Sequence, residues 1–145
     1  MGNIHNIVFR AIARATESED SVKTALSLFI FDKEIETIVT EGHFGNRITI
    51  LNARLKGKDC DRFIDVVKSG LSEPDLQRLR NELYDRMDDE CVLHFRFDKQ
   101  KAYSGAVKLA SSADDTITAE IKLRAYPARP DIAITTAENI FRINS

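Results

Sequence analysis

The chain has 145 residues, of which 43% are hydrophobic and 30% are charged, and its formal net charge at pH 7 is −2. This composition predicts one soluble globular domain over residues 1–145, which can bury a core without a disulfide or a metal ion. The small negative charge excludes a uniformly basic protein, so any contact with nucleic acid must use a local patch.

The sequence has no pattern for secretion or for a membrane. Its amino terminus lacks a basic segment followed by an apolar core, and no apolar run approaches the roughly 20 residues of a membrane helix. Cys60 and Cys91 lie far apart without metal-ligand spacing, which predicts two buried, reduced thiols. We therefore expect a cytoplasmic protein without a membrane partner.

The first elements are a strand and a helix. Apolar side chains alternate along residues 5–15, which predicts a half-buried strand, although Val8 and Ile12 put apolar side chains on its second face. Thr16 followed by Glu19 is a capping-box pattern, and apolar residues then recur at helical spacing. This part of the chain therefore predicts a strand followed by an amphipathic helix.

The middle of the chain predicts a hairpin and two helices. Strands are expected at 34–41 and 48–56, joined by the glycine-containing turn at 42–46. A short helix over 61–69 follows, and Ser72 caps a heavily charged helix that continues to residue 87.

The last part of the chain predicts more strands and a closing helix. Strands are expected at 91–98, 105–110 and 116–125, and an amphipathic helix begins at Pro130. Consecutive strands outnumber β-α-β units in the resulting order, β-α-β-β-α-α-β-β-β-α. That order favours the α+β class, with a mainly antiparallel sheet and helices packed on one face.

Residues that could carry catalysis are scattered. The three histidines fall on different predicted elements, and the acidic clusters fall in predicted turns. No glycine-rich phosphate loop or metal-ligand spacing is present in the sequence. We therefore predict a protein that is not an enzyme and uses no catalytic residue, metal ion or cofactor. A nuclease built from the scattered carboxylates is the least favoured alternative.

Cationic side chains share the outward parity of four predicted strands. These residues are Arg10, Arg14, Arg54, Lys56, Arg96, Lys122 and Arg124. In a single sheet they would form a basic face that can neutralise phosphates. The alternative is an ordinary solvent-exposed face on which acids of the 34–41 strand balance the positive charge. The pattern alone favours that alternative.

Three motifs carry a resemblance to a known family. Residues 40–51 (TEGHFGNRITIL), 95–105 (FRFDKQKAYSG) and 124–129 (RAYPAR) resemble small archaeal proteins described as RNA-binding and as predicted exosome-associated subunits. The opening HNIVFRAIARATE also fits, so the resemblance spans nearly the whole chain. It departs where His43-Phe44 replaces an aromatic-His order and where Arg47 replaces proline.

The resemblance implies a fold similar to that of the large-subunit ribosomal protein that binds five-S RNA. It also implies RNA as the ligand, with RNA processing or degradation as the setting. Together with the cationic parity, it predicts a non-catalytic RNA-binding protein in which cations contact phosphate and tyrosines stack on bases. The predicted RNA-binding residues are Arg10, Arg14, Arg54, Arg96, Lys99, Tyr103, Lys122, Arg124, Tyr126 and Arg129.

A second hypothesis stays open beside RNA binding. The acidic pI and the heavily charged 72–87 helix would also suit a protein-interaction subunit of a larger complex, with little direct RNA contact.

Overall fold

The central strand, β1 (Ile4–Arg14), separates a buried face from an exposed one by simple alternation. Ile7, Phe9, Ala11 and Ala13 are buried, whereas Arg10, Ile12 and Arg14 are exposed. This alternation arises because successive side chains of a strand point to opposite sides of the sheet. The structure is a computed structural model that describes residues 3–14, 16–31, 33–42, 45–111 and 115–141.

Five antiparallel strands form one open sheet in the order β2-β3-β1-β5-β4. The other strands are β2 (Glu36–Glu41), β3 (Arg47–Leu55), β4 (Val92–Asp98) and β5 (Thr116–Leu123). The helices are α1 (Glu19–Ile30), α2 (Lys58–Gly70), α3 (Glu73–Asn81), α4 (Leu83–Arg86), α5 (Lys99–Tyr103) and α6 (Pro130–Ile140). The predicted α+β class with a mainly antiparallel sheet is confirmed.

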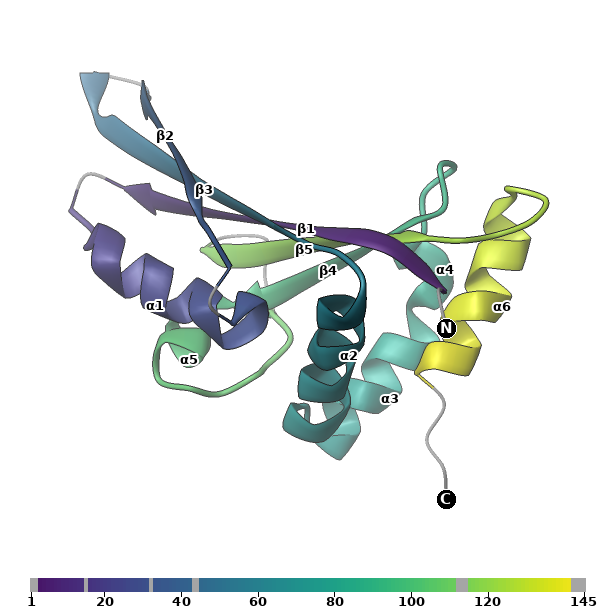
Figure 1. Ribbon diagram of the computed structural model, residues 1–145. Coiled ribbons are helices and arrows are strands. Elements are labelled where there is room, and N and C mark those ends of the chain that lie inside the picture. Colours follow the sequence, from purple (N-terminus) through teal and green to yellow (C-terminus); the bar gives the residue numbers. More distant parts are fainter. Residues whose placement is uncertain (1–2, 15, 32, 43–44, 112–114, 142–145) are drawn as a thin grey trace.

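The helices leave one face of the sheet uncovered (Figure 1). α1, α2, α3 and α5 lie on one side of the sheet, and the β2–β3 hairpin projects beyond them. We call the uncovered side the open face. It carries the even-numbered residues of the five strands, apart from the buried Ile4, where the register between β1 and β5 shifts.

An aromatic cluster joins the helices to the covered face of the sheet. Phe29 of α1 stacks on Phe97 of β4 with ring centroids 4.5 Å apart, and Phe9 of β1 meets Phe63 of α2 edge-on at 5.1 Å. All four side chains are fully buried. Burial of this kind stabilises a fold by roughly 1.5–3 kcal/mol for each large apolar side chain. The cluster therefore fixes which face of the sheet stays open.

The two cysteines are free and buried, as predicted. Burial, together with the neighbouring Asp61 and Asp59 carboxylates, raises the pKa of the Cys60 thiol to about 11. Such a thiol is protonated and unreactive at neutral pH. Among the described residues, no helix is long and apolar enough to cross a membrane.

The predicted strand at 105–110 is wrong. Asp98 caps a short helix, α5, by accepting a hydrogen bond from the Lys101 amide, so the helix occupies most of the predicted turn. Beyond it the chain touches β4 at one bridge, Leu109 to Phe97. A side chain that satisfies the first free amides favours a helix at this point over continued strand pairing.

Two helix predictions also need correction. The cap of α1 is Ser18 rather than Thr16, because the Ser18 hydroxyl accepts the hydrogen bond from the Ser21 amide. The helix predicted to run to residue 87 is divided at Glu82 into α3 and α4. Ser72 caps α3 as predicted.

His43 and Phe44 of the predicted hairpin turn lie outside the described residues.

Lys99 is a buried cation at the start of α5, with 3% of its surface exposed. Its ammonium lies 2.7 Å from a Glu17 carboxylate oxygen and 2.6 Å from one of Asp115, and it donates to the Ile12 carbonyl at 2.8 Å. The bond to Lys99 lowers the pKa of Asp115, and this effect outweighs the opposing effect of its partial burial. Lys99 thus ties α5 to β1 and to the segment that precedes β5.

Replacement of this lysine should destabilise the fold. In Lys99→Met both carboxylates and the Ile12 carbonyl lose their cationic partner, and we expect a loss of about 1–2 kcal/mol, since the carboxylates remain partly solvated. Urea unfolding measures the loss. Lys101→Met, an exposed position on the same helix, is the matched control and should change stability by under about 0.5 kcal/mol. Equal stability of the two variants would contradict this role for Lys99.

Candidate nucleic-acid interface

One row of side chains crosses the open face from edge to edge. The pairing register aligns Glu36, Asn52, Arg10, Thr118 and Arg96 on β2, β3, β1, β5 and β4. Arg10 Nε donates to the Asn52 amide oxygen at 3.2 Å. The Thr118 hydroxyl donates to the Arg10 carbonyl at 3.4 Å. Two guanidinium groups, one on the central strand and one on the edge strand β4, therefore lie on either side of Thr118.

Three arginines surround one hollow of about 300 Å³ on this face. Arg10 and Arg14 reach it from β1 and Arg96 from β4, while Ile12 and Thr118 lie between them. We call this the arginine hollow. Lys99 and Asp115 also border it, but these two are engaged with each other. No ion pair between described residues involves Arg10, Arg14 or Arg96.

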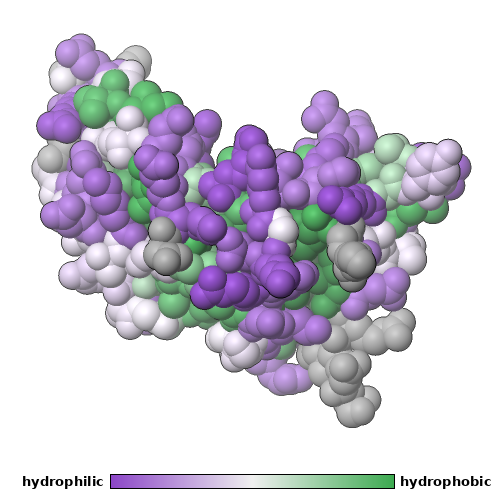
Figure 2. Space-filling model, viewed as in Figure 1, coloured by the Kyte–Doolittle hydropathy of each residue, from purple (hydrophilic) through white to green (hydrophobic). Residues whose placement is uncertain are grey.

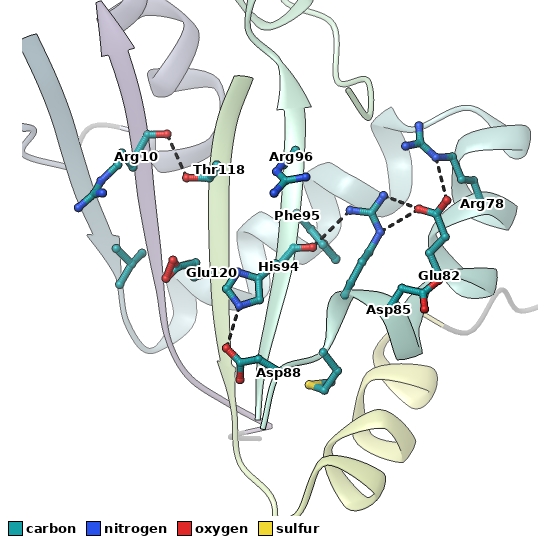
Figure 3. A pocket seen from close by; sticks show the side chains of 13 residues that line it. Arg10, Arg78, Glu82, Asp85, Asp88, His94, Phe95, Arg96, Thr118 and Glu120 are labelled. Carbon is teal, nitrogen blue, oxygen red and sulfur yellow. Dashed lines mark hydrogen bonds and ion pairs between the residues drawn. The ribbon is translucent and has the colours of Figure 1, made fainter. Parts of the chain in front are cut away.

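A larger groove of about 710 Å³ lies next to the arginine hollow and shares Arg10, Arg96 and Thr118 with it. Its other wall comes from α3, α4 and the turn before β4 (Figure 3). Figure 2 shows the surface hollowed above the sheet and lined by hydrophilic residues. We call this the mixed groove, because arginines and carboxylates alternate around it. Its lining residues with ionisable side chains are Arg10, Arg78, Glu82, Asp85, Arg86, Asp88, His94, Arg96 and Glu120.

An arginine–glutamate–arginine cluster builds the helical wall of the mixed groove. Glu82 accepts from Arg86 at 2.6 Å and from Arg78 at 3.3 Å, at i,i+4 spacing on both sides. Arg86 also donates to the His94 carbonyl of β4, and Arg78 donates to the Ala110 carbonyl in the segment that bridges to β4. Partial burial would raise the pKa of Glu82, but the two arginines together lower it.

Asp88 organises the turn that leads from this wall into β4. Its carboxylate accepts from the Glu90 and Val92 amides and lies 2.8 Å from the His94 ring nitrogen. Burial acts to raise the pKa of Asp88, yet the bonds from His94 and the two amides lower it overall. Glu82 and Asp88 are therefore ionised at neutral pH and engaged in holding the wall together.

Acids also lie on the sheet itself. Glu36 occupies the β2 end of the central row, and Glu120 lies on β5 opposite His94. Both are exposed. The cations that were predicted from strand parity therefore meet acids on the same face, but these acids do not enter the arginine hollow. The open face consists of a cationic centre with carboxylates on either side.

The other predicted strand residues lie on the open face away from that centre. Arg54 is exposed one row from Arg10, opposite Val8 on β1. Lys122 lies four residues along β5 from Thr118, which is about 13 Å. Its ammonium donates to the Glu90 carbonyl. Arg124 follows β5 directly and is exposed.

The remaining predicted residues lie off the sheet. Lys99 is buried as described above, and Tyr103 ends α5, which lies beside α1 on the covered side (Figure 1). Tyr126 is 97% exposed in the connection between β5 and α6. Arg129 in the same connection pairs with Asp131 at 3.1 Å. The fold therefore does not bring the two tyrosines to the arginine hollow.

Sequence reasoning missed the helical wall. Arg78, Glu82 and Arg86 were considered only as part of a charged helix, although their i,i+4 spacing is the pattern of consecutive ion pairs on one helix face. Nothing local to the sequence indicates that this face lies against the edge of β4, because that contact depends on the order of the strands.

The fold and the site define an α+β protein whose sheet exposes arginines on one face. Comparison with known proteins agrees with this class. A family described as RNA binding matches residues 6–123, and the chain belongs to this family.

Two comparisons cover nearly the whole chain. It is 34% identical over 137 residues to the RNA-binding protein PAB1135 of Pyrococcus abyssi, covering 90% of this chain and 88% of that one. The solved structure of Mth689, a DUF54 protein from Methanothermobacter thermautotrophicus, matches with a TM-score of 0.83 and 32% identity, over 96% of this chain and 98% of that one. The family description is that of an RNA-binding protein and not of an enzyme, in agreement with the sequence analysis.

The Glu82 cluster predicts a specific acid sensitivity. Because the folded pKa of Glu82 is lowered, its contribution to stability is present above the unfolded pKa of about 4.3 and is lost as the pH falls through the folded value. Glu82→Gln should therefore reduce stability at pH 7, and the difference from wild type should narrow below about pH 4.3.

Urea unfolding at several pH values tests this dependence. Glu138→Gln on α6, an exposed residue, serves as the control and should follow the wild-type profile. A Glu82→Gln variant that matches wild type at pH 7 would show that the cluster adds no stability.

Proposed function

We propose that this protein binds RNA on its open face, with phosphates held at the arginine hollow. The observation that carries the proposal is the convergence of Arg10, Arg14 and Arg96 on one hollow without an ion-pair partner among the described residues. The family description and the name of the Pyrococcus relative support RNA as the ligand.

The chemistry of the hollow suits phosphate. Guanidinium groups form paired hydrogen bonds with phosphate oxygens and keep their charge at every physiological pH. The Thr118 side chain lies between Arg10 and Arg96, but its one hydroxyl hydrogen is donated to the Arg10 carbonyl, so the guanidinium groups are the donors for phosphate. Because the chain as a whole is slightly acidic, binding would depend on this local field and not on net charge.

The other predicted RNA-binding residues would contact RNA only outside the arginine hollow or support the hollow indirectly. Arg54, Lys122 and Arg124 would extend contact along the open face, and Tyr126 and Arg129 would reach RNA only beyond the end of β5. For Lys99 we propose a supporting part, since its ammonium is already bound by two carboxylates. Tyr103 would meet RNA only if the ligand passed around the sheet to α5.

Removal of two arginines should lower both affinity and its salt dependence. For Arg10→Ala with Arg96→Ala we expect about two fewer phosphate contacts, so the slope of log affinity against log salt should fall by about 1.4 for single-stranded RNA. Fluorescence anisotropy with a labelled RNA oligonucleotide across a salt series measures the slope.

The control variant removes the same charge from the covered side. Lys58 and Lys68 are exposed on α2, and neither forms an ion pair with another described residue. Lys58→Ala with Lys68→Ala should leave the slope unchanged. An equal decrease in both double variants would mean that binding follows overall charge, and the open face would lose its special role.

We further propose that RNA processing or degradation is the setting, in association with an exosome-type complex. This part rests on the resemblance of the three sequence motifs alone. The competing hypothesis is a protein-interaction subunit that uses the charged α3–α4 wall.

Affinity purification of the tagged protein with and without nuclease separates these alternatives. Exosome subunits should co-purify, and nuclease should reduce their recovery if RNA contributes to the association. Full recovery after nuclease, with Arg10→Ala and Arg96→Ala without effect, would favour the protein-interaction subunit. Absence of exosome subunits would reject the proposed setting but not RNA binding.

A further inference from the structure

An apolar band lies beside the arginines on the open face. The register aligns Ile38, Ile50 and Ile12 on three adjacent strands, and their side chains point away from the helices. Ile12 is 42% exposed and Ile38 is 44% exposed, while Ile50 between them is partly exposed. With strands about 4.8 Å apart, the band spans about 10 Å.

The position of Ile12 joins this band to the cationic centre. It lies midway between Arg10 and Arg14 along β1, and all three residues line the arginine hollow. An exposed isoleucine in the middle of a strand leaves apolar surface in contact with water, which is unfavourable and which a polar residue would avoid. Ile12 therefore offers an apolar surface bordered on both sides by guanidinium groups.

From this juxtaposition we infer that the open face binds RNA with unpaired bases and that a base lies on Ile12, while the adjoining phosphates contact Arg10 and Arg14. The inference rests on the proposed function and adds the class of RNA. An unpaired nucleotide presents a flat apolar base next to a charged phosphate, which matches an apolar side chain between two cations. A duplex keeps its bases stacked inside and presents sugars and phosphates.

The mixed groove supports the same class of ligand. A duplex seated on the arginine hollow carries a second row of phosphates, and the adjoining groove is lined by Glu82, Asp85, Asp88 and Glu120. Like charges at close range disfavour that arrangement. A single strand can place its phosphates at the arginines and turn base amino groups toward carboxylate acceptors.

The test compares one RNA oligonucleotide that lacks internal pairing with the same strand annealed to its complement. Anisotropy titrations at one salt concentration should give at least tenfold tighter binding of the unpaired strand. Ile12→Asn should weaken binding of the unpaired strand by about fivefold to tenfold and leave duplex binding unchanged.

Val39→Asn is the matched control. Val39 is an exposed β-branched residue of β2, but its register partner is the buried Thr49, so it points away from the open face. This variant should bind both RNAs as wild type does. Urea unfolding of the two variants shows whether they are folded to a similar extent.

The possible failures are distinguishable. Equal affinity for the unpaired strand and the duplex would overturn the inference while RNA binding stands. If the wild-type protein bound neither the unpaired strand nor the duplex, the proposed function and the inference would both be overturned. If Ile12→Asn instead disrupted self-association and left RNA affinity unchanged, the band would be a contact between copies of this chain, and the inference would be wrong.

Discussion

The structure depends on the alternation of side chains along β1. The same strand that sends Phe9 into the aromatic cluster sends Arg10, Ile12 and Arg14 to the other side, where no helix covers them. A shift of one residue in the pairing of β1 would exchange these two sets. The buried phenylalanines therefore fix the side of the sheet on which the arginines lie. The stability of the core determines how firmly the arginines are held in place.

The order of the strands then determines which of these alternating residues lie next to one another on the open face. β5 lies between β1 and β4, so Arg10 and Arg96, which are 86 positions apart in the chain, lie in one row with Thr118 between them. Arg86 of the helical wall binds β4 at the His94 carbonyl, and Arg78 binds the adjoining segment at the Ala110 carbonyl. The wall and the sheet together form the mixed groove, where arginines keep their charge beside ionised carboxylates. A local cationic centre is thus compatible with a slightly acidic protein.

Much of this arrangement could be predicted from the sequence, because period-two alternation identifies both faces of each strand. Arg10, Arg14 and Arg96 follow from that pattern alone once the strands share a sheet. The burial of Lys99 could not be predicted in this way, since its environment comes from Glu17 and Asp115, which lie far from it in sequence. Asp98 ends β4 as predicted, but the sequence did not indicate that the same residue caps α5 and turns the chain away from the sheet. In the sequence, Ile12 is an apolar exception on the polar face of the first strand. Only its neighbours in the sheet, Arg10 and Arg14, suggest a function for it.

The central claim is that RNA contacts the open face at Arg10, Arg14 and Arg96. An NMR titration of the labelled protein with an RNA oligonucleotide tests it most directly, through the side-chain Nε–Hε signals of these arginines and the backbone amides of β1, β4 and β5. The account predicts that the largest shifts fall on these arginines and on Thr118, with α1 and α2 unaffected. Shifts concentrated on the helix-covered side, or around the β5–α6 connection alone, would contradict it.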